Sequence, residues 1–123
     1  MSLSDQLVSF EAGRYSPIME MLQFVAINGF RKNDVKGPRR LVMVSDMLQN
    51  TPGFSHYKGD FDFEEFAKTT YFQKIRSNLR GVEVRAIYLL HTPDLQTRRN
   101  EKFWEDFMDE MNAKLVFVDI LEG

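Results

Sequence analysis

Two different spacings of apolar residues alternate along the chain, and together they predict strands separated by helices. Three apolar runs, at 41–44, 82–90 and 114–121, predict strands. Runs without strict alternation are typical of parallel strands buried on both faces. Helical spacing of apolar residues precedes the first run, continues through much of 62–80 and recurs at 103–111. Strands separated by helices of this length indicate right-handed crossovers and a parallel sheet.

Local signals indicate where these helices begin and end. Ser16, which stands before a proline, is the expected N-cap of the first helix. Asp62 with Glu65 three residues later suits a capping box, and Gly81 is the expected C-cap of the helical segment before the second strand. Residues 4–15 are polar and mixed, so we interpret them as a lead-in to the first helix.

The predicted fold is a single α/β unit over residues 1–123. It is expected to be a three-layer, Rossmann-like parallel sheet of about three strands with helices on both faces. Such a small sheet leaves at least one edge unpaired, which predicts a homodimer through an exposed sheet edge or face, or completion by a missing strand. Residues 1–3 and 122–123 are interpreted as expression-vector remnants, so that a signal or membrane segment could lie outside this sequence.

Composition narrows the classes of function. The 123 residues are 43% hydrophobic and 28% charged, as in an ordinary globular domain. The net charge of −2, with both signs interspersed, argues against a nucleic-acid partner. The sequence has no cysteine, which excludes disulfides and thiol nucleophiles and favours a reducing, cytoplasmic location. No apolar run approaches the roughly 20 residues of a membrane span, so no membrane contact is expected from this chain.

Polar residues that follow the predicted strands are the candidates for binding. Ligands of open parallel sheets bind beyond the carboxyl ends of the strands. Ser16 and Asp46 could supply oxygen ligands to Mg²⁺ or another divalent cation, although they would form an incomplete site. Alternatively, Asp46 and Asn50 only accept hydrogen bonds from loop amides. The candidate binding-loop residues are Asn50, His56, Tyr57 and His91.

We find no complete catalytic motif, and the chain is expected not to be an enzyme. Phosphate-binding glycine motifs, a nucleophile elbow and a carboxylate pair suited to acid–base catalysis are all absent from the sequence. Two alternatives stay open. One is a receiver-like signalling domain with Asp46 as the phosphoacceptor, although the acidic pair and lysine of such a domain are missing. The other is a small hydrolase that uses Asp46 and His91, for which no nucleophile is evident.

Two segments resemble the C-terminal half of a von Willebrand factor A-like domain. Residues 13–22 resemble the loop and helix in which that family places a metal-site threonine, and Ser16 stands at that position. Residues 40–46 resemble a later strand that ends in a metal-site aspartate, here Asp46. The resemblance covers about residues 13–121, and the stretch around 44–52 is also similar to uncharacterised bacterial proteins.

This resemblance implies a protein-interaction module rather than an enzyme, with a protein partner and with specificity in loops such as 47–61. The chain departs from the family at two points. The first metal motif, Asp-x-Ser-x-Ser, is absent, and Met47 replaces the glycine that commonly follows the late aspartate. The cation site implied by the resemblance is therefore incomplete or degenerate in this sequence.

Overall fold

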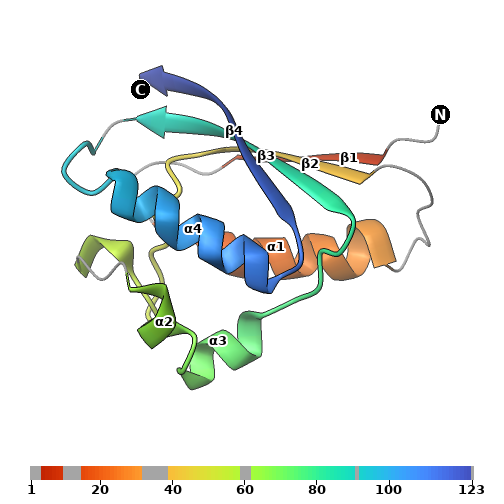
Figure 1. Cartoon of the computed structure of the whole chain (residues 1–123), viewed down its shortest axis with the longest axis horizontal. Coiled ribbons are helices and arrows are strands. Elements are labelled where there is room, and N and C mark those ends of the chain that lie inside the picture. The colour runs from red at the N-terminus through yellow and green to blue at the C-terminus, as the bar shows by residue number, and fades with distance from the viewer. Residues whose placement is uncertain (1–3, 10–14, 32–38, 59–61, 91, 123) are drawn as a thin grey trace.

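Four parallel strands form a single sheet in the computed structural model, which describes residues 4–9, 15–31, 39–58, 62–90 and 92–122 (Figure 1). The strands lie side by side in chain order: β1 (Ser4–Ser9), β2 (Arg39–Ser45), β3 (Val82–Leu90) and β4 (Lys114–Glu122). All three pairings are parallel. The α/β class, the Rossmann-like parallel sheet and the three predicted strands are thereby confirmed.

The additional strand, β1, corrects the interpretation of residues 4–15 as a lead-in. β1 lies at the edge of the sheet and pairs only with β2, where Leu7 is the register partner of Val42. An edge strand forms its ladder with one neighbour through backbone hydrogen bonds, so it does not need the continuous apolar run of a central strand. The polar sequence Ser4–Ser9 hides this strand from a search for apolar runs.

Helices fill the connections between the strands. Their bounds are α1 (Ile18–Val25), which continues as the π-helix η1 (Ala26–Arg31), the short 3₁₀ helix η2 (His56–Lys58), α2 (Phe63–Phe66), α3 (Thr70–Ile75) and α4 (Arg98–Glu110). The predicted amphipathic helix before the last strand is α4. None of the helices in the described ranges is both long enough and apolar enough to cross a membrane.

One of the three predicted helix caps is confirmed. The carboxylate of Asp62 accepts hydrogen bonds from the amides of Glu64 and Glu65, as an N-cap should. Helix α1 instead has Pro17 as its N-cap residue, without a side-chain hydrogen bond, because the backbone of Ser16 pairs elsewhere. Gly81 is not a C-cap, since α3 ends at Ile75; its φ of +80° serves the turn that leads into β3.

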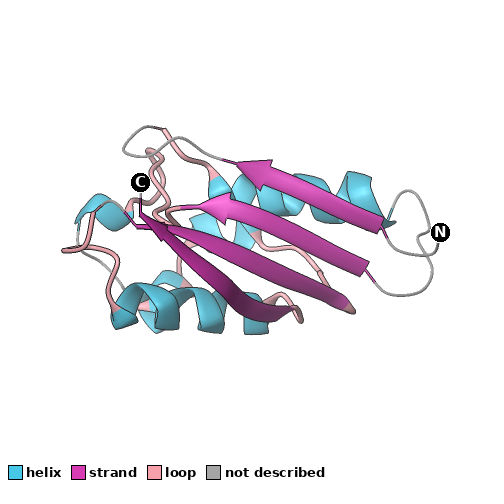
Figure 2. Cartoon of the chain, turned by 90° about the horizontal axis from the view of Figure 1, so that it is seen from above, coloured by secondary structure: helices cyan, strands magenta, loops and turns pink. Residues whose placement is uncertain are grey.

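The described helices all lie on one face of the sheet, which corrects the prediction of three layers (Figures 1 and 2). When strands follow one another in chain order across a parallel sheet, crossovers of one hand bring every connecting helix to the same side. Helices on both faces require the strand order to reverse. The order β1-β2-β3-β4 contains no reversal, so the described part of the chain has two layers.

The hydrophobic core lies between the sheet and this helical layer. Alternate residues of β2 and β3, such as Leu41, Met43, Val84 and Ala86, are buried beneath the helices. Helix α4 contributes Phe103, Trp104, Phe107 and Met108, and α1 contributes Ile18, Met19 and Leu22. The aromatic residues of the sequence therefore serve mainly to fill this core.

Candidate functional site

The carboxyl ends of the strands form a rim, and two predicted site residues, Ser16 and Asp46, lie along it. Asp46 directly follows β2. Ser16, which precedes α1, pairs with Asn50 through two backbone hydrogen bonds: the Ser16 amide donates to the Asn50 carbonyl at 2.9 Å, and the Asn50 amide donates back at 3.0 Å. Ser16 thus lies against the loop that begins at Asp46, as the parallel arrangement of the strands requires.

Hydrogen bonds within the loop engage the carboxylate of Asp46. Its side chain is 1% exposed, and Oδ1 accepts a hydrogen bond from the Leu48 amide at 3.0 Å. The preceding residue, Ser45, is buried as well, and its hydroxyl accepts from the Met47 amide at 2.9 Å. Both side chains therefore stabilise the turn after β2, which is the loop-capping role that the sequence left open for Asp46.

Met47 adopts the backbone conformation that glycine usually takes. Its φ is +57°, in the left-handed region, and its side chain is fully buried. Its carbonyl accepts hydrogen bonds from Asn100 Nδ2 at 3.0 Å and from Trp104 Nε1 at 2.6 Å. Two side chains of α4 therefore hold the backbone of the turn after β2 by hydrogen bonds. The side chain of Met47 packs in the core, while its backbone takes the left-handed conformation of the turn.

The described residues do not fit a divalent cation. Ser16 offers a buried hydroxyl that makes no hydrogen bond within the described ranges. The one carboxylate that the resemblance supplies is that of Asp46, whose Oδ1 already accepts a hydrogen bond from the Leu48 amide. Elsewhere in the described part of the chain, no group of three or more acidic or histidine side chains could hold a metal ion. Hard cations require about six oxygen ligands, which these two residues do not provide.

His56 belongs to the core rather than to the surface of the loop. Its side chain is 0% exposed, and its ring meets Phe54 and Phe103 edge to face. Nδ1 accepts a hydrogen bond from the Gln49 amide at 2.9 Å, so this nitrogen carries no proton. Burial lowers the pKa of His56 to about 3, which keeps the ring neutral. The expectation that His56 is a binding-loop residue does not fit this position.

Two further binding-loop candidates differ in what the structure shows of them. Tyr57 is half-buried at the exposed end of the loop. His91 lies outside the described residues, so its proposed part in binding or hydrolysis stays a prediction.

A polar network that the sequence analysis missed joins this loop to α1 and α3. Gln49 Nε2 donates to Glu20 Oε1 at 2.9 Å and to the Tyr71 hydroxyl at 3.1 Å, while the Tyr71 hydroxyl donates to Glu20. The Thr51 hydroxyl lies 3.0 Å from the Tyr71 hydroxyl. Burial, together with the hydrogen bond to Glu20, raises the pKa of Tyr71 to about 12. The two partners in each of these contacts are 20 or more positions apart, so no local spacing indicates their contact.

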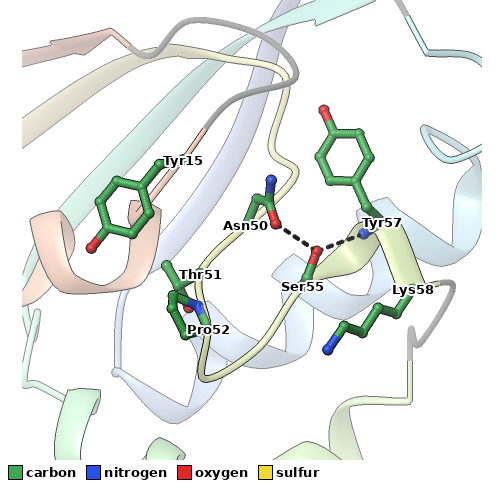
Figure 3. A pocket seen from close by; sticks show the side chains of 7 residues that line it. All are labelled: Tyr15, Asn50, Thr51, Pro52, Ser55, Tyr57 and Lys58. Atoms are coloured by element: carbon green, nitrogen blue, oxygen red, sulfur yellow. Dashed lines mark hydrogen bonds between the residues drawn. The ribbon is translucent and has the colours of Figure 1, made fainter.

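The accessible part of the rim is a groove of about 510 Å³ (Figure 3). It runs between the segment before α1 and the loop after β2, and it is lined by Tyr15, Asn50, Thr51, Pro52, Ser55, Tyr57 and Lys58. The Ser55 hydroxyl donates to Asn50 Oδ1 at 2.9 Å and accepts from the Tyr57 amide at 3.1 Å, which fixes one wall. Tyr15 is 69% exposed and forms the opposite side.

The chemistry of this groove is that of a contact surface. Two tyrosines and a proline supply apolar area, and Lys58 supplies one positive charge. The hydroxyls of Thr51 and Ser55 are buried and form hydrogen bonds within the molecule, so they shape the groove. The described residues that line it include no acidic side chain, no histidine and no cysteine. Comparisons with protein-family models, with curated proteins and with solved structures found no match to this chain.

Proposed function

We propose that this chain is a non-catalytic protein-interaction module of the von Willebrand factor A-like type, with a degenerate divalent-cation site. Its partner binds at the groove between Tyr15 and the loop of residues 50–58. The observation that carries the proposal is the division of the rim into two parts. Asp46 and its neighbours are buried and engaged in internal hydrogen bonds, whereas Tyr15, Pro52 and Lys58 of the groove are exposed.

The lining of the groove indicates the kind of partner that would bind there. Tyrosine provides a large contact area at a small cost in conformational entropy, and is enriched where proteins bind one another. Lys58 is exposed at one end of the groove, so it favours a segment that carries an acidic side chain. The proposed ligand is therefore an extended segment of a protein, with aromatic or aliphatic side chains beside a carboxylate.

The burial of Asp46 favours this proposal over the receiver-like alternative. A phosphoacceptor must reach a phosphodonor, but the Asp46 side chain is 1% exposed and Oδ1 faces the Leu48 amide. Incubation with a small phosphodonor should leave Asp46 unlabelled. Stable labelling of Asp46 would overturn the interaction-module proposal in favour of a receiver.

Selection of peptides from a displayed random library against the purified chain tests the groove directly. Selected peptides should lose about tenfold or more in affinity for the Tyr15→Ala and Lys58→Glu variants, as expected for central contact residues. The matched control is Lys102→Glu, which makes the same change of charge on an exposed face of α4. Asp46→Ala, or chelation of divalent cations, should change the affinity by less than about twofold, because one carboxylate and one hydroxyl make a poor oxygen site.

Two results would contradict the proposal. In one, the selected peptides bind the groove variants as well as they bind the wild-type chain. In the other, micromolar binding of Mg²⁺ or Mn²⁺ is measured by calorimetry and is abolished by Asp46→Ala, which would show a working cation site.

A further inference from the structure

The face of the sheet opposite the helices carries side chains that belong neither to the core nor to the groove. In β2 and β3 the residues that alternate with the buried ones are half-buried, and no described helix lies over them (Figure 2). Toward the carboxyl ends of the strands they are apolar: Val42, Val44, Ile87 and Leu89, with Val116 of β4 beside them. None of these five contributes to the core cluster. We call these residues and the charged residues described next the open face.

Charged residues occupy the other end of the open face. Arg40 in β2, Glu83 in β3 and Lys114 in β4 lie in one row across the strands, since Glu83 is the register partner of both of the others. Glu83 Oε1 lies 3.7 Å from Arg40 Nε and also pairs with Arg85, two residues further along β3. The hydrogen bond from Arg85 and the charges of Arg85, Arg40 and Lys114 lower the pKa of Glu83. The row thus alternates in sign from strand to strand.

We propose that the open face packs against the open face of a second copy of this chain, related by a twofold axis that runs parallel to the strands between β2 and β3. Parallel sheets are almost always covered on both faces, so this face requires an occupant. Two sheets pack face to face about 10 Å apart with nearly aligned strands, which such an axis permits.

The charges select this occupant and this axis. The axis places each residue of β2 opposite its register partner in β3 of the other copy. Arg40 therefore meets Glu83 of the second copy, and Glu83 meets Arg40 of the second copy, so this contact of opposite charges occurs twice in the dimer. In the same way Val44 meets Ile87, and the position of Lys114 faces that of Asp5 in β1. Val42 meets Arg85, whose aliphatic stem packs on the valine while its guanidinium stays paired with Glu83 of its own copy.

A twofold axis perpendicular to the strands would give a different result. It would lay the charged row over the apolar end that contains Leu89, which would bury charges against apolar side chains. The alternating row is self-complementary only when the strands of the two copies point in the same direction. This charge complementarity is the reason to place a second copy, rather than an unrelated protein, on the open face.

Sedimentation of charge-reversed variants tests the proposal. The wild-type chain should form dimers, and Arg40→Glu and Glu83→Arg should each weaken dimerisation by about tenfold or more, because each puts like charges across the axis twice. An equimolar mixture of the two variants should regain the dimer, since every pair across the axis is then opposite in charge. Within each variant chain, residues 40 and 83 carry like charges, so their ion pair is still broken after mixing. If the pair only stabilised the single chain, mixing could not restore the dimer.

Two further variants complete the experiment. Arg98→Glu is the matched control, because Arg98 pairs with Glu105 on the exposed surface of α4, on the helical side of the molecule; it should dimerise like the wild type. Val44→Asp adds a charge to the open face without touching the helix-side core, and it should be monomeric. Circular dichroism confirms that each variant is folded.

Several outcomes would overturn the proposal. A wild-type chain that stays monomeric at its highest soluble concentration would do so. A dimer that survives Val44→Asp would also do so, because association would then occur through a strand edge or another surface. Folded monomeric variants that do not recover the dimer on mixing would contradict the proposed axis.

Discussion

At the scale of single residues, the polar groups nearest the rim mostly stabilise the fold. His56 illustrates this, because a histidine in a loop is a natural candidate for binding until its surroundings are known. Its ring is enclosed by Phe54, Phe103 and Trp104, and its Nδ1 accepts a hydrogen bond from the loop backbone. A buried neutral histidine stabilises the fold only while it stays unprotonated.

The free energy of unfolding should therefore fall at low pH, where His56 takes up a proton in the unfolded chain. The unfolded chain binds a proton at His56 near pH 6.5, whereas the folded chain binds it only near pH 3. This contribution to stability is complete above pH 6.5 and is lost as the pH falls toward 3, with a slope of up to about 1.4 kcal/mol per pH unit. His56→Asn keeps a hydrogen-bond acceptor near the position of Nδ1 but has no titrating ring.

Urea unfolding of both proteins between pH 4 and pH 7 measures this difference, because one proton is linked to unfolding over this range of about 3 pH units. The His56→Asn variant should be less stable at neutral pH because it loses the packing of the ring. The free-energy difference between the wild type and the variant should shrink as the pH falls. Equal slopes for the two proteins would mean that the histidine titrates as an exposed residue does.

At the scale of elements, the segment that starts α4 holds the rim together. Gln96 Nε2 donates to the carbonyls of Asp46 at 3.0 Å and Leu89 at 2.6 Å, and Gln96 Oε1 accepts from the Thr92 amide at 2.7 Å. One buried amide thus joins the ends of two neighbouring strands to the loop before α4. Thr97 then caps the helix by accepting from the Arg99 amide at 3.2 Å.

Truncation of Gln96 should weaken this junction. Gln96→Ala leaves two strand-end carbonyls and one amide without this partner, and should lower the free energy of unfolding by about 1–3 kcal/mol. Asp94→Ala, on an exposed position of the same loop, is the matched control and should have little effect. Chemical denaturation compares the two variants, and equal stability of Gln96→Ala and Asp94→Ala would contradict the role given to the amide.

The sequence predicted the elements whose signals are local. Strands β2, β3 and β4 have apolar runs, α4 has a strong apolar stripe, and Asp62 has the residue types of a cap. The edge strand β1 was missed, because its ladder depends on backbone pairing with β2 rather than on its own side chains. The contact between Glu20 and Tyr71 was missed as well, since it joins residues 51 positions apart.

At the scale of the whole molecule, the order of the strands determines whether helices cover one face of the sheet or both, which the sequence pattern did not predict correctly. Apolar runs and helical stripes predict a parallel sheet, but they do not say whether the strand order reverses. Without a reversal the helices fall on one face, and the open face follows from that topology. Both proposals depend on this arrangement of helices on one face. The groove lies at the rim of the sheet, and the second copy is proposed to cover the open face.

The most direct test of the one-sided sheet uses the absence of cysteine from this chain. Met43 and Val44 are neighbours in β2 that lie on opposite faces, Met43 beneath the helices and Val44 on the open face. Single cysteines at these positions, Met43→Cys and Val44→Cys, can be compared by their rate of reaction with a thiol reagent in dilute and in concentrated protein.

We expect Val44→Cys to react much faster than Met43→Cys in dilute solution, and to become protected as the concentration rises and the dimer forms. Met43→Cys should react slowly at every concentration. If Val44→Cys is as protected as Met43→Cys even at high dilution, part of the same chain covers both faces of the sheet, and the one-sided architecture is wrong.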